Sequence, residues 1–197
     1  MRSNVCKIEK GTKDLGAILK ESEKVAVYNE LDQKQTLQLR LLCEELDGML
    51  PRIVDEFDGE LWIDFEDGVC KINLSIQFAE FTTKKKKELI SVAKDKKNAA
   101  VKGVVAKIGA AIEEFFLNQE NMSAFSITSG MYCEAVGYGL EYPYQWSLEH
   151  YRASVKKEKK AEAWDELEKS VLASLADDVI VGVKGLKADV VIVKKFA

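Results

Sequence analysis

The strongest constraint on the fold is a pair of adjacent segments in which apolar and polar residues alternate. In residues 59–65, GELWIDF, the side chains of Leu61, Ile63 and Phe65 fall on one face of an extended strand. In residues 69–78, VCKINLSIQF, every second residue is apolar and the intervening ones are mostly polar. The turn sequence Glu66-Asp67-Gly68 separates the two segments. The sequence therefore predicts an antiparallel β-hairpin with one buried face.

Helical periodicity precedes this hairpin. A short strand is expected over residues 4–8, followed by a helix that Thr12 can cap. Asp32 and Gln35 have the spacing of a capping box, in which each side chain binds a free amide at a helix start. The helix that follows should bend or end near Pro51, which has no N–H to donate. Its apolar residues recur in steps of three and four, and they are Leu39, Leu42, Leu46, Met49 and Ile53.

Helix and strand patterns also follow the hairpin. Residues 82–117 read as helical and residues 118–145 as irregular. Helix returns at Ser147 and extends to Leu175, with either a solvated bridge or a break at residues 156–160. A second hairpin is expected from DVIVGV, a turn at Lys184-Gly185, and ADVVIVKKF. The apolar stripe of the central helix comprises Val101, Val104 or Val105, Ile108, Ile112, Phe115 and Phe116.

The order of these elements indicates the fold class. Helices and hairpins alternate without the regular strand-helix-strand rhythm of a parallel sheet. We therefore expect an α+β protein, a two-layer α/β sandwich with a mostly antiparallel mixed sheet. The chain should form a single domain over residues 1–197, with residues 82–145 as a helical and loop insertion.

Composition excludes several classes of function. A net charge of -4 gives no general attraction to nucleic acid, and no apolar segment is long enough to span a membrane or to act as a signal peptide. A cytoplasmic protein is expected. The four cysteines contain no CxxC pair, and His150 is the only histidine. These counts disfavour a zinc ribbon, a dithiol redox motif and any site built from several histidines, so no metal site is expected.

The segment RLLCEELDGML, residues 40–50, carries a family resemblance together with the order of the elements. A capped helix that leads into a hairpin resembles the GHKL superfamily of histidine-kinase-like ATPases, which has a Bergerat-like fold. It is most similar to the small serine-kinase anti-sigma factors. The resemblance implies that Glu45 occupies the position of the catalytic glutamate and Met49 that of the asparagine that binds Mg²⁺. Shifted by one residue, it places Glu44 and Gly48 there, and neither alignment supplies a metal ligand.

The other two nucleotide-binding signatures of the family are also altered. Glu80 is the one acid at the place of the aspartate that receives the adenine amino group. Gly137 and Gly139, in GYGL, are similar to the glycines of the phosphate loop. The resemblance covers residues 1–80 and about 145–197. We therefore expect weak or no ATP binding and no cofactor.

Three hypotheses follow. We favour a degenerate member of this family that regulates by binding a protein partner, in the manner of bacterial anti-sigma factors. The first alternative is an active ATP-dependent protein serine/threonine kinase that uses Mg-ATP, with Glu45 as its base. The second is a binding module whose surface is the basic helix 84–107, for example for nucleic acid. A homodimer is compatible with the sequence. The expected partner-binding residues are Lys84, Lys85, Lys86, Lys87, Tyr142 and Trp146.

Overall fold

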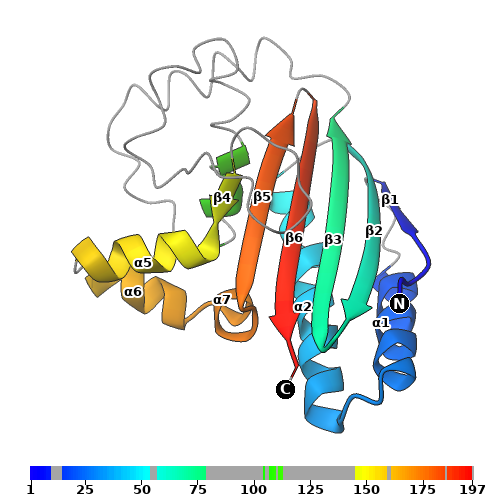
Figure 1. Ribbon diagram of the computed structural model, residues 1–197. Coiled ribbons are helices and arrows are strands. Elements are labelled where there is room, and N and C mark those ends of the chain that lie inside the picture. The colour runs from blue at the N-terminus through cyan, green and yellow to red at the C-terminus, as the bar shows by residue number, and fades with distance from the viewer. Residues whose placement is uncertain are drawn as a thin grey trace.

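The fold is organised around a six-stranded sheet with the strand order β1-β2-β3-β6-β5-β4 (Figure 1). The computed structural model describes residues 1–9, 15–53, 57–78, 104, 107–109, 111–112, 145–158, 161–184 and 186–196. The strands are β1 (Cys6–Glu9), β2 (Phe57–Glu66), β3 (Val69–Phe78), β4 (Gln145–Ser147), β5 (Asp178–Lys184) and β6 (Lys187–Lys195). The helices are α1 (Leu15–Tyr28), α2 (Gln33–Ile53), α5 (Leu148–Glu158), α6 (Ala161–Glu168) and α7 (Val171–Leu175).

The hairpin of β2 and β3 is confirmed with the predicted alternation. Leu61 lies opposite Leu74 and Ile63 lies opposite Ile72, and these four side chains are buried. The turn consists of Asp67 and Gly68, with φ of 49° and 76°. Glycine is needed at position 68 for a second reason, because a Cβ there would lie 2.9 Å from the carbonyl oxygen of Phe196.

Helix α2 begins and packs as the sequence predicts. The amide of Asp32 donates to Gln35 Oε1 at 2.9 Å, and the amide of Gln35 donates to Asp32 Oδ1 at 2.7 Å, which confirms the capping box. The helix ends at Ile53, two residues after Pro51. Four of the five residues predicted for its apolar stripe are buried in the main core, and they are Leu39, Leu42, Leu46 and Met49. The side chain of the fifth, Ile53, lies outside those that the structure describes.

The C-terminal hairpin of β5 and β6 enters the sheet beside β3 rather than at its edge. β6 pairs with β3, and β4 pairs with β5 at the far side. All strand pairs among the described residues are antiparallel, so the mixed sheet expected from the sequence is not found in this part of the chain. The reason is that both hairpins reverse direction and the second docks antiparallel onto the first.

The expected insertion, residues 82–145, lies mostly outside the described residues. Residues 104, 107–109 and 111–112 are helical, and Val104, Ile108 and Ile112 are buried, which confirms three positions of the apolar stripe. The helix expected from Ser147 to Leu175 is found in segments that begin one residue later, because Ser147 is the last residue of β4: they are α5, α6 and α7. Residues 159–160, between α5 and α6, lie outside the described residues. Among the described residues, no helix combines the length and apolar character needed to cross a membrane.

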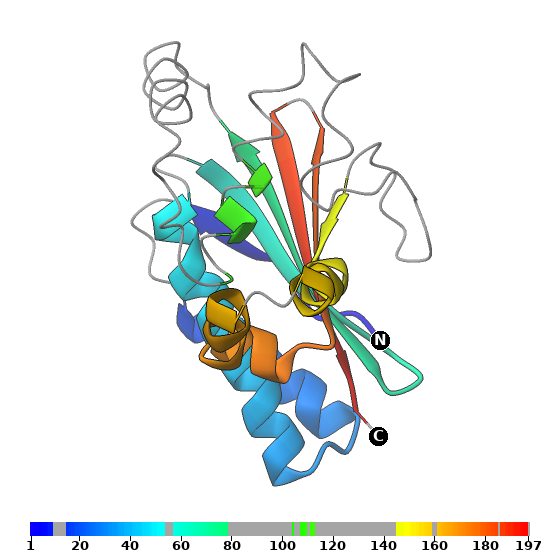
Figure 2. The same ribbon diagram turned by 90° about the vertical axis from the view of Figure 1, so that its left-hand side faces the viewer.

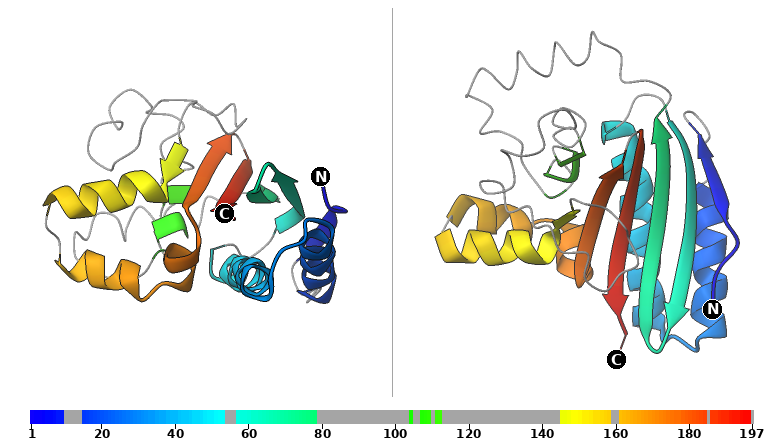
Figure 3. Two further views of the ribbon diagram at one scale, coloured as in Figure 1. Left: turned by 60° about the horizontal axis from the view of Figure 1, so that its bottom comes forward. Right: turned by 45° about the horizontal axis from the view of Figure 1, so that its top comes forward.

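The two faces of the sheet differ in what covers them. Helices α1 and α2 lie together on one face, where the main core is buried (Figures 2 and 3). The opposite face carries polar side chains on β2 and β3. It also holds a second, smaller buried cluster of Ile180, Val191 and Val193, against which Val69 packs.

Candidate functional site

The two acids predicted on α2, Glu44 and Glu45, lie at the border of the main core. Met49, which the resemblance aligns with a metal-binding asparagine, is 1% exposed and belongs to the main core. Glu44 is half-buried and its Oε1 lies 3.0 Å from Arg40 Nε. Glu45 is also half-buried. Burial raises the pKa of the neighbouring Asp47 carboxyl above its ordinary value.

Most of the remaining predicted residues lie in parts of the chain that the structure does not describe. Glu80, Gly137 and Gly139 lie outside the described residues, as do Lys84, Lys85, Lys86, Lys87 and Tyr142. Trp146 is described: it lies on β4, is 6% exposed, and its ring centroid is 6.1 Å from that of Tyr151. Its indole is therefore inside the molecule, on the core face of the sheet.

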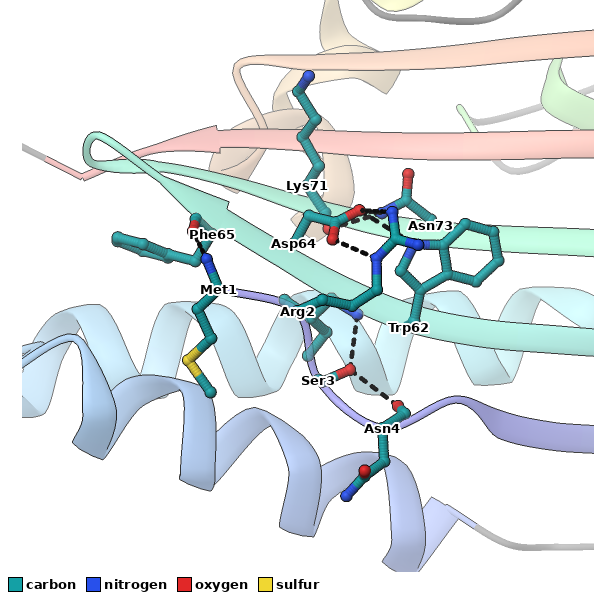
Figure 4. Close-up of polar contacts among 10 residues, drawn as sticks. Met1, Arg2, Ser3, Asn4, Trp62, Asp64, Phe65, Lys71 and Asn73 are labelled. Carbon is teal, nitrogen blue, oxygen red and sulfur yellow. Dashed lines mark hydrogen bonds and ion pairs between the residues drawn. The ribbon is translucent and has the colours of Figure 1, made fainter.

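A polar cluster centred on Asp64 lies on the other face of the sheet, and the sequence reasoning missed it (Figure 4). The Asp64 carboxylate accepts hydrogen bonds from three side chains. Arg2 donates from Nε to Oδ1 at 2.7 Å and from Nη2 to Oδ2 at 3.1 Å. Trp62 Nε1 and Asn73 Nδ2 both donate to Oδ2, at 3.0 and 3.1 Å. One carboxylate thus organises the cluster.

The strands fix three of these side chains. Trp62 and Asp64 are two residues apart on β2 and so point to the same face. Asn73 lies directly opposite Trp62 on β3, and Lys71 lies opposite Asp64. Asn73 is 9% exposed, and its Nδ2 also donates to the carbonyl oxygen of Lys71 at 3.0 Å. The Asn73 amide is therefore held in place by contacts within the hairpin.

Arg2, the fourth side chain of the cluster, lies on a segment that is distant in sequence. Residues Met1, Arg2 and Ser3 run antiparallel to β2, with Arg2 opposite Asp64. The amide of Ser3 donates to the carbonyl oxygen of Ile63, and the amide of Phe65 donates to that of Met1, both at 2.8 Å. The Ile63 amide donates to Ser3 Oγ at 2.9 Å rather than to a main-chain carbonyl. We call residues 1–3 the edge segment.

The edge segment is anchored beyond Ser3 by a buried acid. The main-chain nitrogen and Nδ2 of Asn4 donate to the Glu21 carboxylate at 3.1 and 3.2 Å. Glu21, on α1, is 8% exposed, and Lys24 Nζ lies 2.5 Å from its Oε1. The hydrogen bond from Lys24 lowers the pKa of Glu21, and those from Asn4 lower it further against the opposing effect of burial. The chain therefore leaves the sheet edge at Asn4 and turns toward α1.

The electrostatics of the Asp64 cluster favour a carboxylate paired with a planar cation. Burial alone would raise the pKa of Asp64, but the hydrogen bonds from Arg2 and Trp62, together with the charge of Arg2, outweigh it and lower the pKa. The hydrogen bond to Asp64 in turn raises the pKa of Arg2. The guanidinium carbon of Arg2 lies 5.6 Å from the ring centroid of Trp62. Two hydrogen bonds and an aromatic neighbour are the elements of guanidinium recognition.

A shallow hollow of about 750 Å³ adjoins this cluster. Charged side chains of both signs line it, together with Val69 and Val193. Among the described residues, no group of three or more His, Cys, Asp or Glu side chains is arranged to hold a metal ion. The charged residues that line the hollow are Arg2, Asp64, Glu66, Asp67, Lys71 and Lys195.

The sequence contains only part of the signal for the Asp64 cluster. The alternation in β2 and β3 places Trp62, Asp64 and Asn73 on the polar face. Nothing local connects them to Arg2, which is 62 residues from Asp64. Comparison of the chain with protein-family models, curated proteins and solved structures finds no match.

Proposed function

We propose that this chain is a regulatory protein-binding module, on a scaffold similar to the histidine-kinase-like ATPases, that works without Mg-ATP. The burial of Met49 is the observation that carries the proposal. Magnesium prefers hard oxygen ligands, and a thioether packed in an apolar core offers none. In the alignment that the resemblance implies, the burial of Met49 therefore supports the loss of the metal site.

The alternative alignment also supports a loss of nucleotide chemistry. It pairs Glu44 with Gly48, which has no side chain, and Glu44 already forms an ion pair with Arg40. A micromolar nucleotide site corresponds to about -8 kcal/mol. Losing one charge-assisted contact costs about 1.5–3 kcal/mol, which weakens such a site by one to two orders of magnitude.

Exposed apolar side chains favour binding to another protein. Val27 and Tyr28, at the end of α1, are 79% and 72% exposed, and Leu37, near the start of α2, is 54% exposed. Arg40 Nη1 lies 3.4 Å from Glu23 Oε1, an ion pair that joins the two helices. Large apolar side chains left exposed to water are a feature of interaction surfaces. Regulation of a partner, as by an anti-sigma factor, is consistent with such a surface.

Calorimetric titration of the full chain with Mg-ATP tests the proposal. We expect no binding heat at high micromolar nucleotide, whether for the wild type or for Glu45→Ala. A parallel assay follows transfer of labelled phosphate to any protein that co-purifies with the chain. Micromolar binding of Mg-ATP, with phosphate transfer that Glu45→Ala abolishes, would show instead that the chain is an active kinase.

A further inference from the structure

We propose that the Asp64 cluster and the adjacent edge of β2 form a recognition site for an extended, arginine-containing segment of a partner protein, which replaces the chain's own edge segment there. The inference rests on the proposed protein-binding function and adds the chemistry of the partner. Arg2 then acts as an internal occupant of the site, and the edge segment acts as a competitor.

The Asp64 carboxylate is oriented as a hydrogen-bond acceptor independently of Arg2. Trp62 Nε1 and Asn73 Nδ2 both donate to Asp64 Oδ2, and both belong to the same hairpin as Asp64. Their hydrogen bonds orient the carboxylate whether or not Arg2 is present. A receptor that needs no rearrangement binds its ligand at a lower cost in conformational entropy.

The Asp64 site selects arginine over lysine. The guanidinium of Arg2 uses Nε and Nη2 on the two carboxylate oxygens while its carbon lies near the Trp62 ring. A planar, forked cation can make both hydrogen bonds and stack at once. An ammonium group is a point charge and lacks this fork.

The main chain of β2 offers strand pairing beside Asp64. Ile63 and Phe65 exchange main-chain hydrogen bonds with the edge segment, and an incoming strand can make the same bonds. The edge segment fills this edge imperfectly, because the Ile63 amide is bound by the Ser3 hydroxyl and Asn4 already turns toward Glu21. A main-chain carbonyl of a partner strand can instead accept a hydrogen bond from the Ile63 amide.

A partner segment can displace the edge segment. The side chains of Arg2 and Asp64 are 64% and 29% exposed, and ion pairs this accessible to water contribute little to stability. Asn4 keeps the edge segment close through Glu21, so it competes with a partner at a high effective concentration. The hollow beside Asp64 has room for side chains that flank the incoming arginine.

The test uses fluorescence anisotropy with a blocked, dye-labelled peptide of sequence Met-Arg-Ser-Asn-Val, which copies residues 1–5. It is titrated with the full-length wild type and with Arg2→Ala, which removes the internal guanidinium. Two further proteins combine Arg2→Ala with either Asp64→Asn or Glu60→Gln. Glu60→Gln is the matched control, since Glu60 is an exposed acid on the same face of β2 and does not line the hollow beside Asp64.

We expect Arg2→Ala to bind the peptide about tenfold more tightly than the wild type, because the internal guanidinium no longer competes for Asp64. Adding Asp64→Asn should weaken that binding about tenfold, and adding Glu60→Gln should leave it unchanged. A second peptide with citrulline in place of arginine has the same shape without the charge, and it should bind Arg2→Ala at least about tenfold more weakly. The citrulline comparison keeps the test decisive if the Asp64→Asn variant does not fold.

Equal binding of the arginine and citrulline peptides, or no binding to Arg2→Ala, would overturn the inference. So would sedimentation that shows a wild-type dimer which Arg2→Ala dissociates, since the occupant would then be a second copy of this chain. Failure of the peptide test leaves the proposed function standing, because Mg-ATP calorimetry tests that separately. Tight Mg-ATP binding would overturn the proposed function even if the peptide bound.

Discussion

Met49 and Asp47 lie two residues apart on α2 in different environments. Met49 is packed in the main core, whereas Asp47 is half-buried at its border. Burial of an uncharged thioether stabilises the fold, while burial of a carboxylate opposes its ionisation. Substitutions at the two positions should therefore act in opposite directions.

Met49→Asn should lower the free energy of unfolding by about 2–5 kcal/mol, because it replaces apolar contacts with an amide that has no partner in the core. Met49→Leu keeps the volume and should cost less than about 1.5 kcal/mol. Urea denaturation monitored by circular dichroism measures both. If the Met49→Asn variant is as stable as the wild type, the side chain at this position has access to polar groups.

Asp47→Asn should raise the melting temperature at pH 7. The folded-state pKa of Asp47 is above its unfolded value of about 4, so its charged form costs stability once the pH rises through that interval. The gain from Asp47→Asn should disappear at pH 3, where the carboxyl is protonated in both states. Asp58→Asn, at an exposed site on β2, is measured in parallel as the surface control.

At the scale of elements, the ends of α5 and α7 are held by residues from outside each helix. Asp178, on β5, is 5% exposed and accepts hydrogen bonds from the amide of Glu149 at 2.9 Å and from Ser147 Oγ at 3.0 Å. Arg152, on α5, donates to the carbonyl oxygens of Ala173 and Ala176 at the end of α7. These contacts satisfy main-chain groups that helix ends leave open, and they tie the helices to the sheet.

Asp178→Ala should lower the free energy of unfolding by about 2–4 kcal/mol, since it removes a helix cap and leaves buried donors without an acceptor. Asp165→Ala, which breaks only an exposed ion pair with Lys169, should cost less than about 1 kcal/mol. Chemical denaturation of the two variants side by side provides the measurement. Equal losses would show that Asp178 contributes no more than a surface acid.

At the scale of the whole molecule, two carboxylates with lowered pKa values fasten the first residues to the rest of the fold. Asp64 holds Arg2 against the sheet, and Glu21 holds Asn4 against α1. A group whose folded pKa is below its unfolded value stabilises the fold above the unfolded pKa, about 4, and that stability is lost as the pH falls through the folded pKa. Both acids therefore contribute at neutral pH.

The urea midpoint of the wild type should fall as the pH is lowered from about 5 to about 2, and Asp64→Asn combined with Glu21→Gln should flatten this dependence. The double variant should also be less stable than the wild type at pH 7. Asp58→Asn combined with Glu60→Gln, at two exposed acids of β2, is the matched control. If the control flattens the curve as strongly as the test variant does, general charge repulsion is responsible for the acid sensitivity.

Local chemistry in the sequence determined the parts of this protein that lie close together along the chain. The capping box of Asp32 and Gln35, the turn at Asp67 and Gly68, and four residues of the apolar stripe of α2 are confirmed. Each depends on residues within one or two turns of helix or on adjacent strands. The phosphate-loop glycines and the lysine-rich segment stay predictions, because they lie outside the described residues.

Only the tertiary structure decided which distant segments meet. It placed β6 between β3 and β5, and it brought Arg2 to Asp64 across 62 residues. Alternation shows which face a side chain takes but not which strand will pair with it, because pairing is selected by packing of the whole sheet. The sequence by itself therefore determined the hairpins and capped helices, and the assembled sheet decided where the guanidinium and its carboxylate come together.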